Sequence, residues 1–338
     1  MEDAAAPEPR QPHRQGLIAT ASRLHLFSTY ADVIAVLRDP DGFGSERSPD
    51  NVLLSTKDGE DHTRLRSALQ SALSAGVIAA LEPTIRLRAG ALAHDIARSG
   101  RADLVPDYVI PLTRSAVAAL LSIEPDDESA VFGALRERDD ATVDAFLRSH
   151  AARTSRRAPD TVGQLIAAGL DHDRELLPHM RMLLQAGHGT MVDLVADVLL
   201  DLVSAPESWA HVDQPGADDA MNRVLRARAP LPFIERRARR ECTVGSATID
   251  TGDTIVLALA SANRDRSGAE LPHLALGAGV HSCLGGSLLR CVTRCAVTEL
   301  HRAAPQVELV DGGVERDETN LADRGLVRLC ILVGAQSP

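Results

Sequence analysis

The chain has 338 residues, of which 44% are hydrophobic and 25% are charged, and its formal net charge is −11 at pH 7. These values predict a globular protein of one large domain with a sizeable core. The negative charge argues against a general nucleic-acid surface, which needs clustered positive charge. The longest apolar runs, such as residues 109–123, are interrupted by Arg114 and are too short to span a bilayer, so no membrane segment is expected.

The first residues and the cysteines bear on the cellular compartment. Residues 1–15 are acidic, then proline-dotted and polar, without the basic start and apolar middle of a secretion signal. We therefore expect a loose tail over residues 1–15 before a single domain over residues 16–338. The five cysteines are an odd number in a chain with no export signal, which argues against a disulfide framework. Both observations favour a reducing, cytoplasmic location.

Apolar residues at helical spacing predict helices over residues 29–38, 58–73, 77–99 and 111–123. In the second of these, His62 and Arg66 are four residues apart and share one face. Residues 126–160 are polar and arginine-rich, which predicts short helices and loops.

A longer helix is predicted over residues 177–204, where apolar residues run almost continuously. Asp193, Asp197 and Asp201 form its only polar edge, at four-residue spacing. We expect this helix to be buried on most sides and to cross the centre of the molecule.

Strand patterns begin only after Pro230. Residues 235–245 alternate in polarity, residues 246–261 are typical of a hairpin turning at Thr251-Gly252, and residues 326–334 form a further short strand. The arginine-rich run at the first strand could attract an acidic redox partner, although alternation would point Arg237 and Arg239 at water in either case. The sequence predicts a mainly α fold with a minor β-sheet.

A glycine-rich loop with a cysteine stands directly before a predicted helix over residues 284–301, in the run LALGAGVHSCLGG. A thiolate of Cys283 there would gain from the positive end of the helix dipole and from backbone donors. Gly277, Gly279 and Gly285 would let the backbone approach something flat and close. The alternative is a buried, inert cysteine in a glycine-rich turn.

A zinc cluster is a second alternative for this region, with His273, His281, Cys283, Cys291 and Cys295 as ligands. It lacks the paired C-x-x-C spacing of zinc sites, and its last two cysteines fall on the predicted helix. The sequence disfavours it.

The loop resembles the cysteine loop of bacterial cytochrome P450s, F-G-x-G-x-H-x-C-x-G. Every element matches except the phenylalanine, where this chain has Leu276. The resemblance implies a shortened cytochrome P450-like fold that binds haem b (iron protoporphyrin IX), with the Cys283 thiolate as the axial iron ligand.

The resemblance also implies partners for the two haem propionates. His62 and Arg66 match the H-x-x-x-R helix of the family, Arg236 matches the arginine of the strand before the hairpin, and His281 lies two residues before the cysteine. Guanidinium to carboxylate pairing is strong because it is charge-assisted and can be bidentate.

The run LLQAGHGT in the long helix is similar to the oxygen-binding A-G-x-(D/E)-T of the family. This implies that Ala186 and Gly187 leave room above the iron and that Thr190 hydrogen-bonds the bound dioxygen. The alternative for Thr190 is a hydrogen bond back to a helix carbonyl. Gly189 replaces the acid that normally helps to relay protons, so the usual proton route is not expected.

The E-x-x-R pair of the family reads Arg223-Val-Leu-Arg226 here, and the segment that would carry its arginine partner is shortened. Arg226 thus lacks both of its family partners, the glutamate and the second arginine. Their joint loss is consistent, because one of them left alone would be an unpaired buried charge, which is costly. The simplest interpretation is a rebuilt scaffold.

The N-terminal region and residues 126–160, which cap the substrate pocket in the family, are abbreviated, which predicts an open site for a bulky ligand such as a macrocycle or modified peptide. The expected function is a haem-thiolate oxidase that tailors a bulky natural product by oxidative decarboxylation, desaturation or hydroxylation. Cys283 and Thr190 would be catalytic, with electrons from a ferredoxin-type donor.

The alternative function is a non-catalytic P450-like helper of a glycosyltransferase. The missing acid and the missing glutamate favour it. The retained haem-binding positions weigh against it, namely His62, Arg66, Arg236, His281 and Cys283.

Overall fold

The computed structural model describes residues 23–45, 50–154, 160–265, 271–317 and 325–334. The tail expected over residues 1–15 lies outside them. The helices are α1 (Tyr30–Leu37), α2 (Gly59–Ala72), α3 (Ala75–Ser99), α4 (Ile110–Leu120), α5 (Pro125–Glu137), α6 (Asp140–Arg153), α7 (Thr161–Ala167), α8 (Leu177–Val203), α9 (Pro206–Ala210), α10 (Gln214–Ala227), α11 (Leu259–Ala262) and α12 (Gly286–Ala303). The strands are β1 (Leu24–Phe27), β2 (Phe43–Gly44), β3 (Arg101–Asp103), β4 (Phe233–Ala238), β5 (Cys242–Val244), β6 (Ala247–Ile249), β7 (Thr254–Ala258), β8 (Val307–Arg316) and β9 (Leu326–Val333). The predicted mainly α fold with minor sheets is confirmed.

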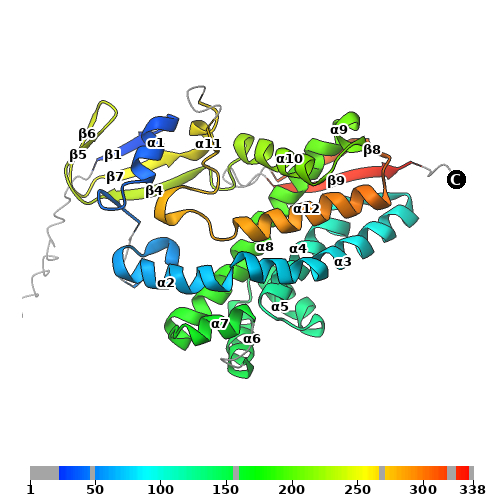
Figure 1. The fold of residues 1–338 in the computed structure, drawn as a ribbon, viewed down its shortest axis with the longest axis horizontal. Coiled ribbons are helices and arrows are strands. Elements are labelled where there is room, and N and C mark those ends of the chain that lie inside the picture. Colours follow the sequence, from blue (N-terminus) through cyan, green and yellow to red (C-terminus); the bar gives the residue numbers. More distant parts are fainter. Residues whose placement is uncertain (1–22, 46–49, 155–159, 266–270, 318–324, 335–338) are drawn as a thin grey trace, which may run out of the picture.

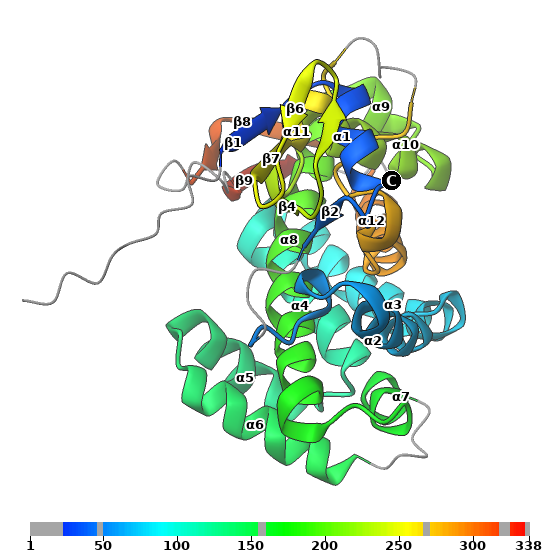
Figure 2. The ribbon, with the colours of Figure 1, turned by 90° about the vertical axis from the view of Figure 1, so that its left-hand side faces the viewer.

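The long helix α8 runs through the middle of the helical part, as predicted (Figures 1 and 2). It packs against α4, α10 and α12, and α12 lies along α3. In its C-terminal half, apolar residues such as Val195, Leu199 and Leu202 recur at three- and four-residue intervals and bury most of the surface of the helix.

The aspartates at four-residue spacing on α8 do not all face solvent as their spacing predicts. Asp197 is only 9% exposed and forms ion pairs with Arg316 of β8 and with Arg228, the latter at 3.8 Å. One turn later, Asp201 pairs with Arg223 of α10 at 2.6 Å. The prediction is wrong for Asp197 because arginines from distant segments cover its carboxylate.

The strands form three small sheets. Four strands pair in the order β1-β7-β4-β2, with β1 parallel to β7, and the others form the sheets β3-β9-β8 and β5-β6. At the β1 edge, Arg23 N–H donates to the Asp253 carboxylate at 2.9 Å, between residues 230 positions apart in the chain. The sheet therefore joins the first described residues to the last third of the chain.

Two strand predictions are wrong. Strands β1, β2 and β3 precede Pro230, but they have four residues or fewer, which is too short for a clear alternation. The hairpin predicted at Thr251-Gly252 does not form, because β6 pairs with β5 across Gly245, whereas β7 pairs with β1 and β4. Gly252 turns the chain between two different sheets.

Helices α5 and α6 occupy most of residues 126–160, as the prediction of short helices states. Both views show them beside α8 (Figures 1 and 2), and Figure 2 shows them at the opposite end of α8 from the four-stranded sheet. One helical stretch among the described residues, Gly59–Ser99, is long and apolar enough to cross a membrane. In this fold it consists of two helices, α2 and α3, which pack against α7 and α12.

Candidate functional site

The cysteine loop is a compact turn that ends at the first residue of α12. Gly277 N–H donates to Leu274 O at 2.8 Å, and Cys283 N–H donates to Leu276 O at 2.8 Å. Gly277 and Gly279 have φ of +70° and +69°, the left-handed region that favours glycine. The Cys283 thiol is exposed and lies just before an 18-residue helix, at its positive end. It is not the buried, inert cysteine of the alternative interpretation.

Gly279 also allows the loop to rest on the end of α1. A Cβ at this position would lie 2.2 Å from the carbonyl oxygen of Leu37, which no side chain tolerates without a shift. A Cβ at Gly285 would contact Cys283 Sγ at 3.7 Å. Gly279 therefore sets how close the loop comes to α1, whereas the contact at Gly285 is an ordinary van der Waals distance.

The zinc alternative finds no support in the described part of the chain, where no group of three or more His, Cys, Asp or Glu side chains could hold a metal ion. Cys291 and Cys295 are buried in α12, facing α3.

Four of the predicted propionate partners come together beside the cysteine loop. The rings of His62 on α2 and His281 in the loop have centroids 4.3 Å apart. Arg66, one turn after His62, donates to Ser282 O at 3.1 Å and to Ser282 Oγ at 3.0 Å. Arg236 on β4 lies near enough for its charge to contribute to lowering the pKa of His281. One guanidinium nitrogen of Arg236 donates to the carbonyl of Glu235 at 2.8 Å.

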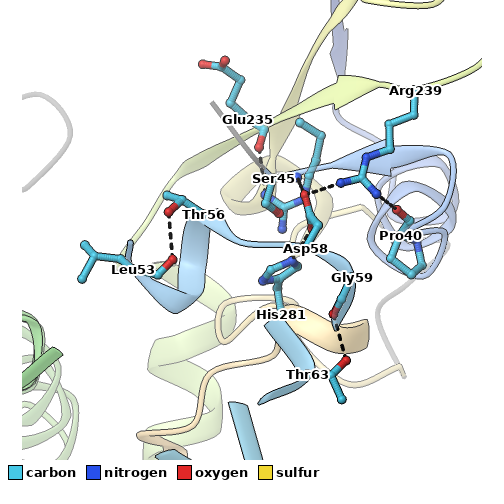
Figure 3. A network of polar contacts seen from close by, with 11 residues as sticks. Pro40, Ser45, Leu53, Thr56, Asp58, Gly59, Thr63, Glu235, Arg239 and His281 are labelled. Atoms are coloured by element: carbon cyan, nitrogen blue, oxygen red, sulfur yellow. Dashed lines mark hydrogen bonds and ion pairs between the residues drawn. The ribbon is translucent and has the colours of Figure 1, made fainter. Parts of the chain in front are cut away.

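Asp58 is a residue of this site that the sequence did not reveal. Its carboxylate accepts from His281 Nε2 at 3.0 Å, from Ser45 N–H at 2.7 Å and from Arg239 Nη2 at 2.7 Å (Figure 3). Asp58 stands directly before α2, where an aspartate is typical of a helix start. Because an aspartate is common at this position, its contacts with distant segments could not be expected from the sequence.

Arg237 and Arg239 are both exposed, as predicted. The side chain of Arg239 is 38% exposed, and its guanidinium is also bound to Asp58, a contact that the sequence did not indicate.

The residues present fit a haem propionate. His62 Nε2 is buried and has no hydrogen-bond partner in the described part of the structure, although buried polar atoms are nearly always paired. Burial lowers the pKa of His62, and the nearby His281 and Arg66 lower it further. A buried nitrogen beside a guanidinium is suited to a carboxylate, which would supply both the missing partner and the missing negative charge.

The oxygen-binding motif forms an exposed patch in the middle of α8. Ala186, Gly189 and Thr190 are exposed, although the helix on both sides contributes to the core. Thr190 Oγ1 donates to Ala186 O at 2.6 Å, which is the back-bond of the alternative interpretation. Gly187 faces α4, where a Cβ would lie 3.4 Å from a methyl group of Val117.

His188, within the same motif, was not singled out from the sequence. Its Nδ1 lies 3.1 Å from Thr113 Oγ1, and its ring meets Phe132 of α5 edge-on at 5.2 Å. Burial, with a smaller effect of Arg114, lowers the pKa of His188 to about 4. His188 is therefore neutral near pH 7 and connects α8 to α4 and α5.

Comparison with known proteins gives a consistent picture. No protein-family model matches the chain. The erythromycin C-12 hydroxylase of Saccharopolyspora erythraea is 30% identical over 322 residues, covering 82% of this chain and 80% of the relative. A putative cytochrome P450, YjiB of Bacillus subtilis, is 28% identical and covers 83% of this chain and 82% of the relative. The crystal structure of HmtN, a post-tailoring hydroxylase of himastatin biosynthesis, superposes with a TM-score of 0.80 at 28% identity, over 91% of this chain and 90% of the other.

Proposed function

Because the chain belongs to the cytochrome P450 family, we propose that it is a haem-thiolate oxidase that tailors a bulky natural product, such as a macrocycle or modified peptide. Two observations carry the proposal. The Cys283 thiol is exposed, and two residues before it the ring of His281 contacts His62, whose buried Nε2 has no hydrogen-bond partner among the described residues. Two similar proteins are described as hydroxylases of erythromycin and of himastatin biosynthesis, which supports a bulky substrate here.

In this proposal Cys283 holds the iron of haem b, and His62, Arg66, Arg236 and His281 face the propionates. A haem held by a thiolate supplies dioxygen activation for chemistry at C–H bonds. The exposure of Ala186, Gly189 and Thr190 in the middle of α8 supports a site that admits large molecules. Electrons would come from a ferredoxin-type donor in the cytoplasm.

The absorption spectrum of the reduced protein under carbon monoxide tests the proposal. We expect a thiolate-type Soret band for wild type and its loss in Cys283→Ser, because only a thiolate ligand gives that band. The alternative is a non-catalytic helper of a glycosyltransferase. Colourless protein after growth with a haem precursor would reject the oxidase.

This chain also differs from the family pattern in the residues that could supply protons to the reaction. Position 189 carries no acid, and the Thr190 hydroxyl hydrogen is already donated to the Ala186 carbonyl. In our proposal a carboxylic acid on the substrate supplies protons in their place, which favours oxidative decarboxylation or desaturation beside hydroxylation.

Substitution Gly189→Glu tests this source of protons. A Cβ at Gly189 would meet nothing within 4 Å, so the substitution fits the fold. We expect Gly189→Glu to raise the turnover of a carboxylate-free substrate analogue by at least about tenfold, with Gly189→Gln as a control of equal size. Equal turnover by both variants would remove the support for substrate-supplied protons.

A further inference from the structure

Three side chains from three other segments hold residues 271–274, which lead into the cysteine loop. Arg226 of α10 donates to Leu271 O. The hydroxyl of Tyr30 on α1 donates to Pro272 O at 2.9 Å. The side-chain oxygen of Asn263, just after α11, accepts from Leu274 N–H at 2.6 Å. We refer to Tyr30, Arg226 and Asn263 together as the loop clamp.

The members of the clamp are also bound to one another and to their elements. Asn263 is 1% exposed and donates through Nδ2 to Leu225 O of α10 at 3.4 Å, while Arg226 reaches Asn263 O at 3.5 Å. Asp265 accepts from the backbone N–H of Tyr30 at 2.9 Å. These contacts connect α1, α10 and the end of α11 around the same short segment.

Two backbone hydrogen bonds link Leu274 to the turn that carries the Cys283 thiol. Leu274 O accepts from Gly277 N–H, and Leu276 O accepts from Cys283 N–H, both at 2.8 Å. A shift of Leu274 therefore moves the turn that presents Cys283. The clamp acts one step away from the iron ligand.

Arg223, at the position of the family's glutamate, is directed elsewhere. It pairs with Asp201 of α8 at 2.6 Å, and its side chain is 54% exposed. The side-chain hydrogen bonds found for residues 271–274 therefore come from Arg226, Tyr30 and Asn263, whereas Arg223 is bound to a different element.

We propose that the loop clamp positions Cys283 for haem ligation, and that it replaces the glutamate-dependent arrangement of the family's E-x-x-R pair. The three side chains are positioning residues, since none of them is the iron ligand. The inference rests on the proposed haem-thiolate function.

The holoprotein variants Tyr30→Phe and Arg226→Met test the clamp. The measured quantity is the Soret ratio, which is the amount of reduced CO complex without the thiolate-type band divided by the amount with it. We expect this ratio to rise about fivefold in Tyr30→Phe, because one neutral hydrogen bond is lost. In Arg226→Met we expect about tenfold or more, because the lost donor is charged. Hydrogen exchange of residues 271–285 should accelerate in both.

Arg223→Ala is the matched control, an arginine one turn away on the same helix. It should leave the Soret ratio at the wild-type value. Variants that only lower the melting temperature, with an unchanged Soret ratio and unchanged exchange, would show a merely structural role and overturn the proposal. An equal spectral effect of Arg223→Ala would overturn it too.

The two proposals fail in different ways. A wild-type protein without the thiolate-type band would reject the proposed function, and hydrogen exchange of residues 271–285 alone would then decide whether the clamp holds the loop. A wild-type protein with the band, matched by both clamp variants, would reject the clamp alone.

Discussion

His188 shows how one side chain in the motif of α8 couples the helix to its neighbours. The Thr113 hydroxyl donates to Val109 O at 2.9 Å, so its oxygen accepts from Nδ1–H of His188. The protonated ring also carries Nδ1–H, but burial disfavours its charge and lowers the pKa of His188 to about 4. The residue is therefore a structural connection that depends on pH.

A folded-state pKa below the ordinary histidine value of 6.5 means that the unfolded chain binds more protons between these two values. The contribution of the neutral His188 to the free energy of unfolding is therefore fully present above about pH 6.5 and is lost as the pH falls towards 4. We expect His188 to account for a loss of about 2 kcal/mol between pH 8 and pH 5. Denaturant unfolding of wild type and His188→Asn at both pH values measures it, since asparagine can still donate to Thr113 and does not titrate. An identical pH dependence in both proteins would contradict the prediction.

At the scale of elements, α8 is held to β8 by a carboxylate that the sequence pattern placed at the surface. Asp197 is bound by Arg316 and Arg228 and is nearly buried. Neutralising this buried carboxylate removes both of its ion pairs at once.

We therefore expect Asp197→Asn to lower the free energy of unfolding by about 3 kcal/mol. Asp201→Asn, one turn later on the same helix, should cost less than about 1 kcal/mol, because its partner Arg223 is largely exposed. Chemical denaturation of both variants gives the comparison. Equal losses would mean that burial does not distinguish the two ion pairs.

The elements that the sequence predicted well are those with long local patterns. The 27 residues of α8 repeat the helical period many times, and the glycine pattern around Cys283 is fixed within 13 residues. The elements that it missed depend on distant partners. Strands of two to four residues contain too few positions for an alternation, and the partner of β6 follows from pairing with β5, which the turn residues at Thr251-Gly252 do not encode.

The same reason explains which site residues were found. His62, Arg66, Arg236 and His281 were predicted through their resemblance to family motifs, and the structure places them beside one another. Asp58, Tyr30 and Asn263 belong to no such motif in the sequence analysis, and Arg226 appears there only as the arginine of the altered E-x-x-R pair. Their roles depend on contacts across long separations, such as Tyr30 to Pro272 and Asp58 to His281, which no local pattern reveals.

At the scale of the molecule, the site lies between two parts of different construction. The helices around α8 carry the exposed patch with Thr190, while the four-stranded sheet and the segments after it carry Arg236 and the cysteine loop (Figure 1). Helix α2 connects them, because its Arg66 is bound to Ser282 and the adjacent Asp58 is bound to His281. The proposed haem would therefore contact both parts, and its binding is expected to stabilise their arrangement.

The parallel pairing of β1 with β7 has a consequence for the order in which the protein is made. Leu24 pairs with Thr254, so the first strand leaves the ribosome long before its neighbour exists. At roughly 5–20 residues per second, the delay is on the order of ten seconds or more. Most helices, up to α10, are synthesised within that interval, whereas the cysteine loop follows β7. Translation therefore completes the four-stranded sheet only after most of the helices have been made, and the cysteine loop, α12, β8 and β9 follow it.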